Sequence, residues 1–160
     1  MGTLSTKAAA VFLAMAVGMS SAFAGVLAQA TNVDGWDEFA EDEIAIPLTK
    51  SGKTTLNFKT KKDNTVVVVT YNAECAVLGP SSARLSIRIT VDDSNTNPKS
   101  GSNFAFCAAT NGTKKIYTAV SRQAVIKVPS AGTHTVEVFG VLPDGATFAS
   151  VDDTSIVVED

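Results

Sequence analysis

The feature that most constrains the fold is an alternation of apolar and polar residues with a period of two. From Arg84 to Asp92, leucine, isoleucine and valine occupy every second position, and arginine, serine, threonine and aspartate lie between them. From Asn64 to Cys75 the same alternation places Tyr71 and Cys75 on the apolar side. Successive side chains of a β-strand point to opposite faces of the sheet. The pattern therefore predicts strands, and the segment 84–92 is expected to have one buried and one solvent-exposed face.

Further strands are predicted from shorter apolar runs separated by turn residues such as Ser51-Gly52 and Asp144-Gly145. The strand predicted at residues 44–48 contains Pro47 and is expected to lie at a sheet edge, because proline cannot donate to a strand ladder. The stretch 92–103 is polar and is expected to be a loop. The predicted strands are Ile44–Leu48, Thr54–Thr60, Phe104–Ala108, Ile116–Val128, Thr133–Leu142 and Ser155–Val158.

These strands predict an all-β chain, specifically a two-sheet antiparallel jelly roll or β-sandwich. A length of 160 residues fits one domain, and 45% apolar residues are enough for a sizeable core. The domain is expected to span residues 44–160. A mildly acidic balance argues against a nucleic-acid partner.

The N-terminal segment has the composition of a secretory signal peptide. Lys7 precedes an apolar run over residues 8–19, and small residues follow as far as Ala24. Cleavage after Ala24 is the first choice, and Ala28-Gln29-Ala30 forms a second site that satisfies the same rule. The apolar run is shorter than the roughly 20 residues of a membrane span, although an uncleaved anchor is the alternative. Residues 1–24 are thus expected to be removed, leaving a secreted protein, extracellular, on the cell surface or periplasmic, without a membrane span.

An acidic segment follows the signal. Residues 25–43 are expected to form an N-terminal arm, since six carboxylates lie between Asp34 and Glu43. The arm is interpreted as a solvated lead into the first strand. The alternative is an interaction arm anchored by Trp36, the only tryptophan of the chain.

Cys75 and Cys107 are the only cysteines, so one intrachain pairing exists. Export permits a disulfide, and Cys75 lies on the apolar side of its strand. We expect a structural disulfide. Two buried free thiols are the alternative, and the spacing is unlike that of a redox-active C-x-x-C pair.

Catalysis is not expected. His134 is the only histidine, lies between two threonines, and is interpreted as an exposed or capping strand residue. Two acidic pairs, Asp92-Asp93 and Asp152-Asp153, could in principle supply the two carboxylates of a glycosidase. Calcium suits these four aspartates better, because loop carboxylates are the hard oxygen ligands that the ion prefers. Solvated loop acids remain the simpler interpretation, and no cofactor is required. Asn111-Gly112-Thr113 matches a glycosylation sequon and also a plain turn.

Three segments carry a resemblance to a known class: the strand end at residues 70–75, the segment Ala131-Gly132-Thr133-His134-Thr135-Val136-Glu137-Val138, and the closing stretch from Asp152 to Val158. Together they resemble secreted microbial jelly rolls of the tumour-necrosis-factor and complement globular-head type, over residues 54–160. The resemblance implies a jelly roll, commonly a homotrimer, that acts through its surface. No collagen-like or coiled-coil stalk precedes the domain, and no binding residue is carried over.

The expected function is therefore binding of a protein or glycan partner, or self-assembly, at the cell surface. A calcium-dependent glycan-binding module is the alternative, and it predicts exposed aromatic side chains. A filament subunit whose N-terminal arm adds a strand to its neighbour is another.

Overall fold

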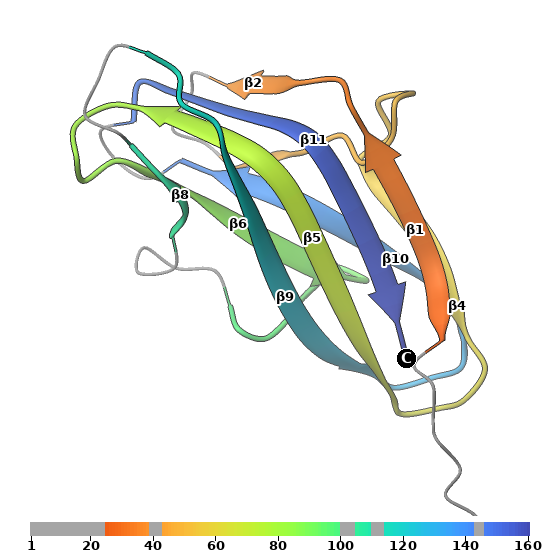
Figure 1. Cartoon of the computed structure of the whole chain (residues 1–160). Helices are drawn as coiled ribbons and strands as arrows, with labels where there is room; N and C mark the ends of the chain where they lie inside the picture. Colours follow the sequence, from red (N-terminus) through yellow and green to blue (C-terminus); the bar gives the residue numbers. More distant parts are fainter. Residues whose placement is uncertain (1–24, 39–42, 100–104, 110–113, 143–145) are drawn as a thin grey trace, which may run out of the picture.

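The computed structural model describes residues 25–38, 43–99, 105–109, 114–142 and 146–160, and every secondary-structure element within them is a β-strand. Two antiparallel sheets pack against each other (Figure 1). Sheet A contains, in spatial order, β1 (Val26–Asn32), β11 (Phe148–Glu159), β5 (Thr65–Leu78) and β9 (Thr118–Val128), and β2 (Trp36–Glu38) also pairs with β11. Sheet B contains β3 (Glu43–Ala45), β10 (Gly132–Val141), β6 (Arg84–Val91) and β7 (Ser94–Asn95), with β4 (Thr55–Thr60) on β10 and β8 (Ala105–Ala108) on β6.

The strand pairing is that of a jelly roll. The eight principal strands in chain order are β1, β4, β5, β6, β8, β9, β10 and β11. In this order the first strand pairs with the last, and the pairing continues inward: β1 pairs with β11, β4 with β10, β5 with β9 and β6 with β8. One long antiparallel ladder is thus folded over into two four-stranded sheets. The predicted all-β, two-sheet fold is confirmed.

The core fills the space between the sheets, and the alternation located it correctly. Val67, Val69, Tyr71 and Cys75 of β5 are buried, as are the apolar residues of β6. The expectation of a solvent-exposed face on β6 is wrong at two positions, because Ser86 and Thr90 are buried as well. β6 is an inner strand of sheet B, with β10 on one side and β7 and β8 on the other.

The disulfide joins the two sheets. Cys75 of β5 in sheet A is bonded to Cys107 of β8 in sheet B, with Cα atoms 6.2 Å apart, and both residues are buried. The predicted pairing is confirmed.

The interpretation of residues 25–43 as a solvated arm is wrong for the part that the structure describes. β1 pairs with β11 along Val26–Asn32, and β2 continues this edge by pairing with residues 149–151. β1 carries no charge, and its Leu27, Ala28 and Ala30 pack against the core. The carboxylates that suggested an arm begin only after β1 has ended. Residues 39–42 lie outside the described part of the chain.

Trp36 serves the packing between the sheets. Gly140 of β10 in sheet B lies so close to its indole ring that a Cβ atom on Gly140 would stand 2.8 Å from Cη2 of Trp36. A Cβ atom there would also stand 3.5 Å from Cδ1 of Ile46. The alternative role of Trp36 as a projecting anchor is therefore not supported, since the ring bridges sheet A and sheet B.

The polar stretch after β6 is more ordered than the sequence suggested. Asp92 and Asp93 have φ angles of 48° and 62° and form a two-residue turn between β6 and β7, as in a type I′ hairpin. Further on, Asn97 exchanges two backbone hydrogen bonds with Val125 of β9, of 2.8 and 2.7 Å. The expectation of a patternless loop is wrong for residues 94–97, because backbone pairing needs no apolar side chains.

Tyr71 leads to a first testable prediction. Its side chain is fully buried near the Phe106 ring, its hydroxyl finds no hydrogen-bond partner among the described residues, and burial raises its pKa far above the usual range. A buried hydroxyl without a partner costs about 1–3 kcal/mol. We expect Tyr71→Phe to leave the free energy of unfolding unchanged or to raise it by about 1 kcal/mol, measured by urea denaturation. A loss above about 1 kcal/mol would show that the hydroxyl is hydrogen-bonded in solution.

Candidate functional site

The outer face of sheet A is a regular surface crossed by four long strands, and its central rows carry no charge. One row across four strands is Gln29, Val157, Thr70 and Gln123. The next row is Thr31, Ser155, Asn72 and Ser121. Residues directly opposite each other share a face of the sheet, so these side chains all point outward.

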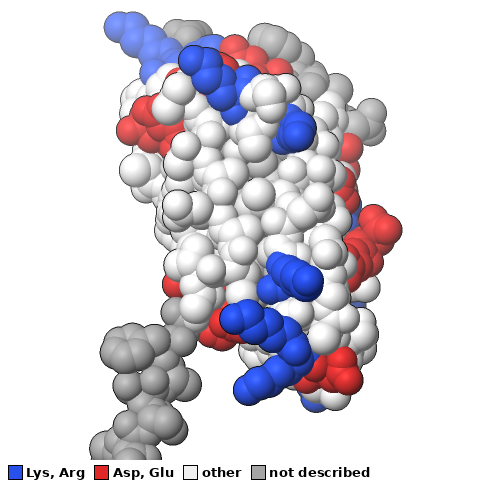
Figure 2. Space-filling model, turned by 90° about the vertical axis from the view of Figure 1, so that its right-hand side faces the viewer, with Lys and Arg blue, Asp and Glu red and all other residues white. Residues whose placement is uncertain are grey.

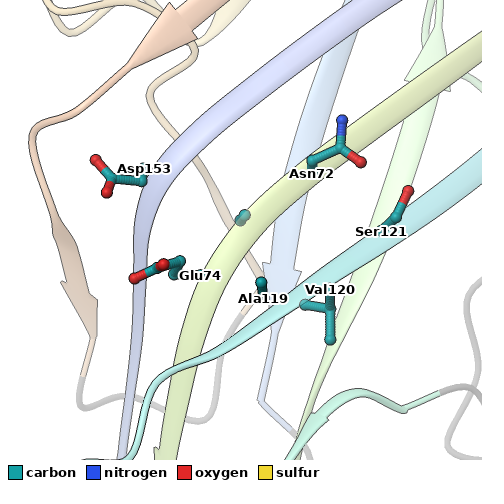
Figure 3. Close-up of a pocket in the computed structure, with 7 residues that line it drawn as sticks. Asn72, Glu74, Ala119, Val120, Ser121 and Asp153 are labelled. Carbon is teal, nitrogen blue, oxygen red and sulfur yellow. The ribbon is translucent and has the colours of Figure 1, made fainter.

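A hollow of about 380 Å³ lies at one end of this face, between β11, β5 and β9 (Figure 3). Glu74 and Asp153 place their carboxylates at one side of it, and Asn72 and Ser121 lie at the other. A second hollow of about 380 Å³ runs between β1 and β11, lined by Gln29–Thr31 and Ser155–Val157. Carboxylate, amide and hydroxyl groups at these positions can hydrogen-bond a polar ligand.

The sequence did not predict these hollows. The alternation over β5 did place Asn72 and Glu74 on the polar side of their strand, and the structure confirms that they face outward. Their neighbours Ser121 and Asp153 come from β9 and β11, strands distant in sequence. Only the strand register brings them together, and a single sequence does not encode that register visibly.

Asp152 and Asp153 form an irregularity in β11. The register shifts between Asp152 and Ser155, and Asp153 has a φ of 45°. The backbone N–H of Asp153 donates to Oδ1 of Asp152 over 2.9 Å. This geometry is typical of a β-bulge. The bulge also breaks the alternation, which explains why only Ser155–Val158 of this strand was predicted.

The buried His134 and the exposed Asp92 form a polar cluster at the β6–β7 turn. His134 is 5% exposed, and its Nδ1 lies 2.7 Å from Oδ2 of Asp92. Its Nε2 lies 3.0 Å from the carbonyl oxygen of Ser130 and 3.1 Å from Oγ1 of Thr60. The Asp92 carboxylate only accepts hydrogen bonds, so Nδ1 of His134 donates to it.

The interpretation of His134 as an exposed or capping residue is therefore wrong. The alternation of the strand already indicated an inward position, because His134 is in phase with Val136 and Val138, which are buried. A strand position in that phase points inward whatever its polarity. The imidazole is accommodated there because Asp92, Thr60 and Ser130 supply its hydrogen-bond partners.

The environment of Asp92 shifts its pKa. Burial alone would raise the pKa of this carboxyl, but the hydrogen bonds from His134 and from the backbone N–H of Thr135 outweigh it, so the pKa is lowered. The Thr135 bond to Oδ1 measures 2.9 Å. Asp92 thus joins the turn to β10, which is a structural role.

The four aspartates proposed as calcium ligands are not brought together. Asp92 and Asp93 follow β6 of sheet B, whereas Asp152 and Asp153 lie in β11 of sheet A. Within the described residues, no group of three or more His, Cys, Asp or Glu side chains has an arrangement that could hold a metal ion.

The aromatic side chains considered for glycan binding have other partners. Tyr71 is buried, and Trp36 packs against Gly140. Tyr117 is 41% exposed, and its hydroxyl lies 2.9 Å from Oγ of the buried Ser150. The sequon at residues 111–113 and the signal segment 1–24 lie outside the described residues.

No helix in the described part of the chain has the length and apolarity needed to cross a membrane. The comparisons with known proteins add no relative: no protein-family model matches the sequence, and no curated protein is similar to it.

Proposed function

We propose that this chain is exported and acts at the cell surface as a non-catalytic jelly-roll binding domain, through the outer face of sheet A. The observation that carries the proposal is the composition of that face. Two complete rows of uncharged side chains cross all four strands, next to a hollow lined by hydrogen-bonding groups. A face of this kind can contact a partner without the cost of desolvating charges.

Two further observations support export. The N-terminal segment has the order of a signal peptide, with Lys7 followed by an apolar run and then small residues to Ala24. The buried Cys75–Cys107 disulfide fits an oxidising compartment. The test is labelling of intact cells with a membrane-impermeant amine reagent, with Leu13→Arg in the apolar run as the non-exported control. We expect labelling of the wild type only. If the wild-type protein is labelled only after the cells have been lysed, export is contradicted.

The binding face is tested separately. Purified mature protein is added to cells that lack it, and the retained fraction is measured for wild type, Gln123→Arg and Thr133→Arg. Both residues are exposed strand positions, Gln123 on the outer face of sheet A and Thr133 on sheet B. We expect retention of wild type and Thr133→Arg, and a severalfold loss for Gln123→Arg. Equal retention of all three proteins, or none of wild type, would overturn the proposed face.

The structure also bears on the choice between the two cleavage sites, and we propose Ala24. Cleavage there leaves β1 whole, whereas cleavage after Ala30 removes five of its seven residues. Blocking the first site with Ala24→Leu should direct cleavage to Ala30 and expose the edge of β11. We expect the exported level to fall severalfold, because destabilised exported chains are degraded. N-terminal sequencing identifies the site used, and an abundant, stable chain beginning at Thr31 would contradict this account.

A further inference from the structure

We propose that the outer face of sheet A binds a neutral glycan chain, with the ring of Tyr117 as a stacking platform at one end of the hollow in Figure 3. This inference rests on the proposed use of that face for binding, and it names the class of ligand. The arrangement behind it is an exposed aromatic ring, tied to the sheet through its hydroxyl, that lies beside a run of hydrogen-bonding side chains.

Two small side chains at the end of this face are buried although they point outward. Ala76 of β5 pairs with Ser150 of β11. Their chain neighbours Cys75 and Val151 belong to the core between the sheets, so Ala76 and Ser150 point to the other face. Both are nevertheless only 1% exposed. Another part of the chain therefore covers them.

The cover is the ring of Tyr117. Cys75 pairs with Thr118, so Tyr117 enters β9 beside Ala76. Its hydroxyl lies 2.9 Å from Oγ of Ser150, on the far side of β5. Neighbouring strands are about 4.8 Å apart, and β9 is two strands away from β11. A tyrosine side chain reaches Ser150 from there only when its ring extends along the sheet, over Ala76.

The ring is held in place and keeps its other face open. Tyr117 is 41% exposed, and this exposure belongs to the face turned away from the sheet. Two residues earlier, Nζ of Lys115 lies 3.9 Å from the centre of the Phe148 ring and 3.5 Å from Oδ2 of Asp37. Residues 115–117 thus lie across the ends of β5 and β11 (Figure 1). The face of an aromatic ring carries partial negative charge and attracts the C–H groups of a sugar ring.

Hydrogen-bonding groups follow the ring along the strands. Glu74 and Asp153 line the side of the hollow next to the ring, and Asn72 and Ser121 line the other side (Figure 3). Gln123 belongs to the next row of the same face. This row lies six residues along the chain from the ring, which is about 20 Å at about 3.3 Å per residue. The face therefore offers contacts to several consecutive sugars.

These groups favour a glycan over a protein as the ligand. Amide and hydroxyl side chains both donate and accept hydrogen bonds, as the hydroxyls of a sugar do. The core of a protein interface is rich in aromatic and apolar side chains, whereas Val157 is the only apolar side chain in the two central rows.

The charges favour a neutral chain. The carboxylates of Glu74 and Asp153 accept hydrogen bonds from hydroxyl groups and repel other anions. An acidic polysaccharide would bring its own carboxylates toward them. The right-hand side of the molecule, with the β1 edge, likewise has a largely uncharged middle, with charges toward both ends (Figure 2). A neutral ligand that extends across the sheet toward β1 thus meets few charged groups.

Titration of the oxidised mature protein with oligosaccharides, followed by amide NMR spectra, tests this inference. The probes are the β-1,4-linked hexamers of glucose, mannose and N-acetylglucosamine, which are neutral and extended. We expect saturable shifts with at least one of them, at the amides of Asn72, Ala119 and Ser121, and none at Thr133 of sheet B. The hexamer of galacturonic acid should bind at least roughly tenfold more weakly, because like charges meet. No saturable shift with any neutral hexamer, shifts confined to sheet B, or tighter binding of the acidic hexamer would overturn the inference.

Variants of the ring make the test specific to the platform. Tyr117→Ala should weaken binding at least roughly tenfold. Tyr117→Phe keeps a ring and should bind more tightly than Tyr117→Ala. Ile116→Ala is the matched control and should bind as the wild type does, since Ile116 is 56% exposed and lies between two residues that face the sheet. Near-ultraviolet circular dichroism checks that each variant is folded. Unchanged binding by Tyr117→Ala, or an equal loss in Ile116→Ala, would overturn the inference.

A failure of this inference is distinguishable from a failure of the proposed function. If the face binds a partner other than a glycan, Gln123→Arg still lowers retention on cells while no hexamer binds. If the face is not the binding surface, Gln123→Arg and Thr133→Arg are retained equally.

Discussion

Reducing the Cys75–Cys107 bond should lower the free energy of unfolding by about 3–4 kcal/mol. The bond closes a loop with a sequence separation of 32 residues, and the loss of chain entropy in the unfolded state gives this magnitude. It is also a covalent link between β5 of sheet A and β8 of sheet B, and β8 has only four residues. We therefore expect the β8 edge of sheet B to loosen first when the bond is absent.

Urea denaturation with and without reductant measures this effect on one sequence. Cys75→Ala with Cys107→Ala provides the matched variant, which should be as unstable as the reduced wild type and indifferent to reductant. Backbone hydrogen exchange locates the loosening, with the largest loss of protection expected in β8. A change below about 1 kcal/mol would mean that packing between the sheets holds β8 without the bond.

The second large effect is expected at His134. His134→Ala removes a buried ring that contacts Phe58, with ring centres 5.3 Å apart, together with its hydrogen bonds to Asp92 and to the Ser130 carbonyl. The cavity and the lost hydrogen bonds together predict a loss of about 2–4 kcal/mol. Thr133→Ala is the control, since Thr133 is the exposed neighbour on the same strand. Equal stability of the two variants would contradict the buried, hydrogen-bonded position of His134.

The same cluster predicts a dependence on pH. The pKa of Asp92 is lower in the folded chain than in the unfolded chain, so its stabilising effect is complete above the ordinary aspartate pKa of about 3.9. The effect is lost as the pH falls through the folded value. Asp92→Asn should therefore be less stable than wild type at pH 7, and the difference should shrink below about pH 4. A difference that stays constant from pH 7 to pH 2 would rule out this contribution of the carboxylate.

Alternation predicted the inward residues of β5 and β6 because those strands are long and rich in valine, leucine and isoleucine. It missed β1, whose small residues contrast weakly with their neighbours, and β2, which has three residues. The acidic residues after β1 misled the interpretation, because a high density of charge in sequence says nothing about the uncharged strand before it.

The candidate site was less accessible from the sequence than the fold. Adjacent aspartates drew attention to residues 92–93 and 152–153, yet the structure uses them in a hairpin turn and a bulge. Both conformations need residues that tolerate positive φ, which aspartate does better than most.

The central claim is that the chain is an exported jelly roll that keeps β1 and its disulfide. The most direct measurement is the intact mass of the protein recovered from outside the cytoplasmic membrane, taken without reductant. The account predicts a chain that begins at Gly25 with Cys75 and Cys107 both oxidised. A chain that is found only in the cytoplasm, with residues 1–24 present and both thiols free, would contradict it.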